Sequence, residues 1–266
     1  MFEEMKIRHL LGFTLLVSIV TITFLVLLSA SEPIVDITLQ LIIYVIVPVL
    51  FFRYHFKKQQ MSVKDVVFVK DVKRLIPSIL GLVVLSIAFS LSVFWFQLFA
   101  LMPFAPGLVD FFLEALPMPE NPWYLAFTII SIAIIAPIAE EFIFRGVLLK
   151  RMIAKTSMWT GIVISSVLFG ILHADIIGAF IFGVVASLLY IKTNNLFVPI
   201  LLHLFNNSIA MIWTFIAPTW PSWAVMENSD IYTEALPNTI VLVISSILMG
   251  RVVLRLARGV KEKQVI

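Results

Sequence analysis

The feature that most constrains the fold of this chain is a series of apolar runs, each close to the length that crosses a bilayer. A membrane-spanning helix needs about 20 predominantly apolar residues, within a range of about 17–25. The candidate runs cover residues 10–30, 34–52, 76–101, 123–149, 158–173, 176–192, 196–216 and 238–254. We therefore predict an all-α fold: a polytopic membrane bundle of about eight transmembrane helices, built as one integral membrane domain over residues 1–266.

The composition agrees with a membrane protein and excludes several other classes. The chain is 61% hydrophobic and 13% charged, whereas a soluble domain is about 45–50% apolar with about 25% charged residues. It contains no cysteine, which excludes a disulfide framework and a thiol nucleophile. The formal net charge of +3 is no signature of nucleic-acid binding, so no nucleic-acid partner is expected.

The distribution of the basic residues predicts the orientation of the bundle. Counting eight spans outward from an inner N-terminus places all 19 Lys and Arg residues on the inner side. The opposite loops, residues 31–33, 102–122 and 217–237, contain acidic residues and no Lys or Arg. Cytoplasmic loops carry such an excess of positive charge. We therefore predict a multi-pass protein of the cell membrane with cytoplasmic N- and C-termini and membrane lipid as a partner.

Two adjacent carboxylates and an arginine interrupt the fourth apolar run: Glu140, Glu141 and Arg145. A charged side chain at the bilayer centre costs at least about 2.5–3.5 kcal/mol, so such residues are candidates for function. Residues four apart share a helical face, which predicts an ion pair between Glu141 and Arg145. Glu140 points about 100° away from Glu141 and is the candidate reactive carboxylate. Pro137, just before it, is expected to bend the helix. The alternative is that all three charged side chains only tie helices together.

The other strong polar residues of the apolar runs are two histidines and two asparagines. His173 ends the fifth run, and His203, Asn206 and Asn207 lie in the seventh. His203 and Asn207 are four apart and share one helical face. Asn206 lies one step round the helix, where it can hydrogen-bond to a neighbouring helix. A single buried His or Asn often has only that structural role.

These groups together are suited to one of two chemistries. A carboxylate in a low-dielectric pocket is a good general base, and a histidine beside it can share the proton of a water molecule. A second histidine and an amide can donate hydrogen bonds to an oxyanion, which completes the equipment for water attack on a peptide carbonyl. Two histidines and one carboxylate could instead hold a zinc ion with a position left for water. The His-Glu-x-x-His arrangement of common zinc proteases is absent from the sequence.

Three short motifs on separate apolar runs resemble those of a known family. Residues 140–145 read Glu-Glu-Phe-Ile-Phe-Arg, residues 169–173 read Phe-Gly-Ile-Leu-His, and residues 203–207 read His-Leu-Phe-Asn-Asn. Their order resembles the CPBP family of intramembrane proteases, which includes type II CAAX prenyl endopeptidases and the bacterial CAAX amino-terminal protease or bacteriocin self-immunity proteins. The resemblance covers about residues 123–217, which would form the family core.

The resemblance implies a role for each catalytic candidate. It implies that Glu140 and His173 activate water and that His203 and Asn207 stabilise the oxyanion. The implied substrate is a membrane-associated or lipidated peptide or protein. The resemblance favours a mechanism that requires no metal, although the family's older name is metalloprotease. If zinc were used, its ligands would be Glu140, His173 and His203.

The remaining motif residues, Glu141, Arg145 and Phe169, would then have supporting structural roles. Two other functions stay open from the sequence. One is a non-catalytic membrane binding or bacteriocin-immunity protein with the same fold. The other is a proton-coupled transporter, which the lack of an inverted repeat between the two halves disfavours.

Overall fold

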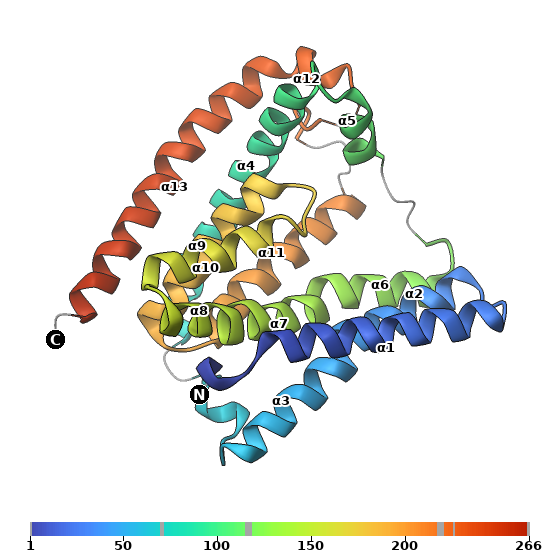
Figure 1. Ribbon diagram of the computed structural model, residues 1–266. Helices are drawn as coiled ribbons and strands as arrows, with labels where there is room; N and C mark the ends of the chain where they lie inside the picture. Colours follow the sequence, from blue (N-terminus) through green and yellow to red (C-terminus); the bar gives the residue numbers. More distant parts are fainter. Residues whose placement is uncertain (1, 70–71, 115–118, 217–220, 226, 265–266) are drawn as a thin grey trace.

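A computed structural model describes residues 2–69, 72–114, 119–216, 221–225 and 227–264, and these residues form helices without any strand. The longer α-helices are α1 (Ile7–Leu27), α2 (Glu32–Leu41), α3 (Val47–Lys58), α4 (Ile76–Leu101), α9 (Met158–Gly170), α10 (Ile176–Thr193), α11 (Phe197–Ile216) and α13 (Ala235–Gln264). The shorter ones are α5 (Pro106–Leu113), α6 (Pro122–Ile130), α7 (Ala136–Glu141), α8 (Lys150–Lys155) and α12 (Asp230–Thr233). The predicted all-helical fold is thus confirmed (Figure 1).

Three π-helical segments and three short 3-10 turns complete the helical structure. The π-helical segments are Ile42–Ile46, Ser131–Ile135 and Phe142–Leu149. The 3-10 turns are Phe2–Glu4, Val63–Asp65 and Val72–Leu75. The π-helical segments join neighbouring α-helices without a break, so α6, α7 and α8 form one continuous segment of 34 residues, Pro122–Lys155.

Six helical segments of the described residues are long and apolar enough to cross a bilayer. They are Ile7–Leu27, Glu32–Lys58, Val72–Leu101, Pro122–Lys155, Ile176–Thr193 and Ala235–Val260. Two shorter apolar helices, Met158–Gly170 and Phe197–Trp213, coincide with the fifth and seventh predicted spans. The chain is therefore a polytopic helical membrane protein. The number of crossings and the side on which each terminus lies stay predictions.

The protein core is built around α10, which packs against α4, α9, α11 and α13. Small residues allow these close approaches: Gly183 of α10 lies so near Ser166 of α9 that an added Cβ would sit 3.0 Å from the serine Cβ. Helix α13 runs along α4 and α10 at one side of the bundle, and α1 runs beneath α6 and α7 at the other in Figure 1. The motif-bearing segments α7, α9 and α11 meet between them.

Candidate active site

The predicted ion pair is present, and it holds a third motif residue. Arg145 Nη1 lies 2.8 Å from Glu141 Oε1, and both side chains are fully buried. His203 Nδ1, from α11, lies 2.9 Å from the same Glu141 oxygen. Burying a charge is costly unless an opposite charge pairs with it. Glu141 therefore joins α7 to α11 as well as pairing within its own segment, a link that the spacing within one helix could not predict.

This arrangement fixes the orientation of the His203 ring. A carboxylate that is paired with arginine accepts hydrogen bonds, so His203 Nδ1 must carry the proton and donate a hydrogen bond to Glu141. The other ring nitrogen, Nε2, then faces Glu140 Oε2 at 3.9 Å. The Glu140 side chain is 15% exposed, whereas the Glu141 side chain is 0% exposed. The two adjacent carboxylates thus differ in burial: Glu141 is enclosed by its partners, and Glu140 keeps a small exposed part.

Phe169 is the common neighbour of the charged and histidine side chains. The guanidinium carbon of Arg145 lies 4.2 Å from the centroid of the Phe169 ring, a cation–π contact. The ring centroids of His173 and His203 lie 4.5 and 5.6 Å from that of Phe169. His173 Nδ1 also donates to the Phe169 carbonyl at 2.8 Å, which leaves its Nε2 without a proton when the ring is neutral. The supporting role expected for Phe169 therefore has a physical basis.

His173 itself lies in the turn after α9, which ends at Gly170. Gln97 of α4 holds this turn from the side: its Nε2 donates to the Ala174 carbonyl at 2.8 Å, and its Oε1 accepts from the Ile176 amide at 3.2 Å. Gln97 is buried, so these two bonds satisfy both ends of its amide. The sequence alone did not indicate this role, because a glutamine in the third apolar run carries no signal that its partners lie in the turn after α9.

Asp175, in the same turn as His173, has a definite structural role. One carboxylate oxygen accepts from the Gly178 amide at 2.9 Å, which caps the N-terminus of α10. The other accepts a hydrogen bond from the Ser90 hydroxyl of α4. The Asp-x-x-Gly spacing at the start of an apolar run was the available signal for this cap. The turn that carries His173 is thus fixed at both α4 and α10.

Pro137 determines the surroundings of Asn207. In the π-helical segment before the proline, the Ala136 amide donates to the Ser131 carbonyl five residues back. The Ile132 carbonyl would then pair with residue 137, but proline has no N–H. Asn207 Nδ2 donates to this free carbonyl at 3.0 Å. The expected departure from a regular helix at Pro137 is therefore present, and it anchors the asparagine of the third motif.

Two hollows adjoin the site. One is a polar cavity of about 170 Å³. Its polar lining residues are Ser86, Ser90, His173, Asp175, His203, Asn206 and Asn207, and Gly178 and four apolar residues complete the lining. An apolar groove of about 770 Å³ lies between α3 and α7, with Tyr44, Phe52, Ile138, Ala139 and Phe142 among its lining residues. Ala139, next to Glu140 in the chain, lines the groove, and His203, whose Nε2 lies 3.9 Å from Glu140 Oε2, lines the polar cavity; Glu140 itself is not among the lining residues of either hollow.

The candidate zinc ligands do not form a ready metal site. No group of three or more His, Asp or Glu side chains in the described parts of the chain is placed to hold a metal ion. Each of the two histidines uses Nδ1 within the protein, His203 toward Glu141 and His173 toward the Phe169 carbonyl, and each keeps Nε2. Whether the protein uses a metal therefore stays a prediction.

The fold and the site define a class of protein: a polytopic helical membrane protein with a buried Glu, His and Asn site shared by three helical segments. Residues 122–209 match the family model described as "Type II CAAX prenyl endopeptidase Rce1-like". This match confirms the resemblance: residues 122–209 are similar to the CPBP family of membrane proteases. The matched segment begins one residue before the predicted family core, residues 123–217. Residue 217 lies outside the part of the chain that the structure describes.

Three relatives share this part of the chain. The candidate membrane peptidase YdiL of Bacillus subtilis (strain 168) is 38% identical over 87 residues, which are 32% of this chain and 36% of YdiL. The membrane-embedded CAAX protease MroQ of Staphylococcus aureus (strain USA300) is 31% identical over 121 residues, 41% of this chain and 48% of MroQ. A 24.3 kDa protein of Escherichia coli is 27% identical over 119 residues, 38% of this chain and 55% of its own length. These matches thus span about half of each relative or less. No solved structure matches the chain.

Proposed function

We propose that the protein is an intramembrane endopeptidase that hydrolyses a peptide bond of a membrane-associated or lipidated peptide or protein. One observation carries the proposal: of two adjacent carboxylates, Glu141 is enclosed by Arg145 and His203, and Glu140 keeps an exposed edge beside His203 Nε2. A positioned carboxylate that keeps an exposed edge and is not paired with an arginine is a suitable general base.

In the proposed reaction, Glu140 takes a proton from a water molecule as the water oxygen attacks the peptide carbonyl. His173 Nε2, whose lone pair is free when the ring is neutral, accepts a hydrogen bond from the same water and orients it. Glu140 then delivers its proton to the leaving amine when the tetrahedral intermediate collapses. General acid–base catalysis of this kind contributes about 10²–10⁴-fold to a rate.

The oxyanion would be stabilised by Asn207 and His203. The Asn207 amide has two N–H groups, and the Ile132 carbonyl accepts only one of them. His203 already donates through Nδ1 to Glu141, so a second donation through Nε2 requires the imidazolium form. The negative charges of Glu140 and Glu141 would offset the positive charges of this imidazolium and of Arg145. Preorganised donors in a water-poor site are worth about 10²–10³-fold each.

The apolar groove supplies a place for the substrate beside this chemistry. Its lining is mostly apolar, with Arg53 and Lys57 among the lining residues. An apolar side chain or lipid group could lie in the groove while the peptide bond reaches Glu140. The substrate class we propose is therefore apolar and reaches the site from within the membrane.

The test is cleavage of a library of apolar and lipidated peptides by the purified protein in nanodiscs. Wild type should cleave, and Glu140→Gln should be at least about 10²-fold slower. Glu120→Gln is the matched control, because Glu120 is an exposed carboxylate remote from the motif residues in sequence. Cleavage should survive a zinc chelator. Undiminished cleavage by Glu140→Gln, or loss on chelation that zinc restores, would contradict the proposed mechanism.

A further inference from the structure

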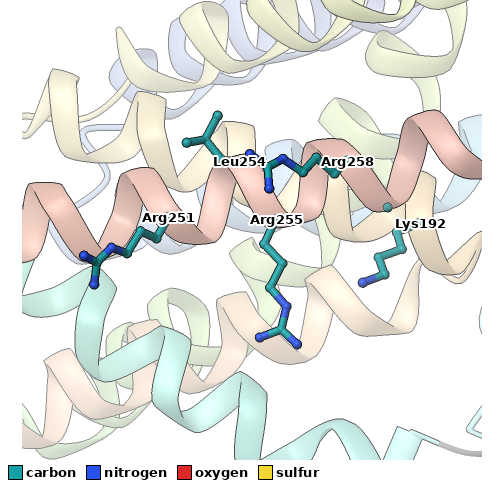
Figure 2. Close-up of a pocket in the computed structure, with 6 residues that line it drawn as sticks. Lys192, Arg251, Leu254, Arg255 and Arg258 are labelled. Carbon is teal, nitrogen blue, oxygen red and sulfur yellow. The ribbon is translucent and has the colours of Figure 1, made fainter.

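A third hollow, a cavity of about 550 Å³, lies away from the motif residues, between the end of α10 and the last third of α13. Its lining consists of Lys192, Gly259 and Leu254 together with three arginines, Arg251, Arg255 and Arg258. Figure 2 shows Arg255 and Lys192 extending to the same side of α13, with Arg251 one turn farther along the helix. Four cationic side chains thus border one hollow, and no acidic residue is among its described lining residues.

Each of the three arginines is exposed, and no ion pair among the described residues includes any of them. Their spacing is i, i+4 and i+7, which places them along one side of the helix over about 10 Å. Like charges this close repel, so the cluster favours an anionic group among them. Arginine suits a phosphate because its planar fork can donate two parallel hydrogen bonds.

The same face of α13 changes character along its length. Ile240, Ile244 and Ile247 precede Arg251 at helical spacing and are each at least half exposed (50%, 54% and 53%). Residues 240, 244, 247, 251, 254 and 258 fall within about 40° of one line along the helix. The face is therefore apolar for about 10 Å, in a segment apolar enough to span a bilayer, and then basic for about the same distance.

We propose that this face of α13 binds one anionic phospholipid. The phosphate would lie among Arg251, Arg255, Arg258 and Lys192, and an acyl chain would lie along Ile240, Ile244 and Ile247. The join of an apolar strip to a basic cavity favours a lipid over a free phosphate, since a free phosphate would use only the cavity. The site is separate from the proposed protease chemistry and does not depend on it.

Native mass spectrometry of the full chain in detergent, with added phosphatidylglycerol or phosphatidylcholine, tests the proposal. Wild type should retain one phosphatidylglycerol molecule in preference to phosphatidylcholine. The double variant Arg251→Gln/Arg255→Gln should bind phosphatidylglycerol about 30-fold more weakly, given the contribution of each basic residue near anionic lipid. The charge-preserving variant Arg251→Lys/Arg255→Lys should retain most of the binding, which separates lost charge from lost folding.

The matched control is Lys73→Gln/Arg74→Gln, which removes two positive charges from exposed residues outside this cavity. It should change phosphatidylglycerol binding by less than about 3-fold. An equal loss in the control and the α13 variant would overturn the proposal, because binding would then follow net charge alone. Displacement of the lipid by millimolar inorganic phosphate would also overturn it and assign the cavity to a soluble phosphate.

Discussion

Helices α1 and α10 are both apolar enough to span a membrane, but they differ sharply in what covers them. In the most apolar window of α10, 50% of the residues are buried inside the protein, whereas in that of α1 only 6% are buried. Small residues differ between the two helices: Gly183 of α10 lies against Ser166 of α9, whereas nothing lies within 4 Å of a Cβ added at Gly12 of α1. In a bilayer apolar residues gain little by leaving lipid, so close packing of small residues decides which helix is interior. The site lies on the side of the bundle where this packing is tight.

The largest expected effect comes from breaking the ion pair within that packed core. Arg145→Met would leave Glu141 buried without its arginine, and removing one partner of a buried pair costs about 3–5 kcal/mol. Thermal unfolding in detergent should show a large loss of stability. Arg8→Met is the matched control, because Arg8 is an exposed residue of α1, and it should change the free energy of unfolding by less than about 0.5 kcal/mol. Equal stability of the two variants would contradict the structural role of the pair.

A leucine truncation sharpens the comparison between the two helices. Leu188 of α10 is 0% exposed and Leu15 of α1 is 63% exposed. Leu188→Ala leaves a cavity and should cost about 2–5 kcal/mol of unfolding free energy. Leu15→Ala removes a side chain that lipid can replace, so its effect should be small. If thermal unfolding shifted equally for both, the burial of α10 would not be the source of the core's stability.

The smallest effect is expected from adding one methyl group to each helix. In Gly183→Ala the new Cβ would lie 3.0 Å from the Cβ of Ser166, whereas at Gly12 nothing lies within 4 Å. Overpacking costs about 1–3 kcal/mol. Gly12→Ala should be neutral or slightly stabilising, because alanine is the better helix former. Thermal unfolding of the two variants provides the measurement, and a stabilising Gly183→Ala would show that α9 and α10 can move apart freely.

The sequence predicted what lies within one helix better than what lies between helices. The Glu141–Arg145 pair followed from i, i+4 spacing, and the irregular helix at Pro137 followed from the missing N–H. The His203–Glu141 bond joins residues 62 apart in the chain, and helical periodicity carries no signal for such a contact. Before the structure, the three motifs were brought to one site by the chemistry of their polar side chains and by the family resemblance.

The position of His173 shows that one apolar run need not be one continuous helix. In the sequence, His173 ends the fifth apolar run, residues 158–173. In the structure α9 ends at Gly170, and His173 lies in the turn that Gln97 and Asp175 hold. The partners of this turn belong to α4 and α10, so its shape depends on tertiary contacts that propensity does not record.

The central claim is that two adjacent carboxylates have different tasks, and one paired measurement tests it directly. Cleavage rate and thermal stability would be measured side by side for Glu140→Gln and Glu141→Gln in nanodiscs. The account predicts that Glu140→Gln loses at least about 10²-fold in rate and keeps the wild-type unfolding temperature. It predicts that Glu141→Gln loses both rate and stability, because Arg145 and His203 lose their common partner. Normal cleavage by Glu140→Gln, or a fully stable Glu141→Gln, would contradict it.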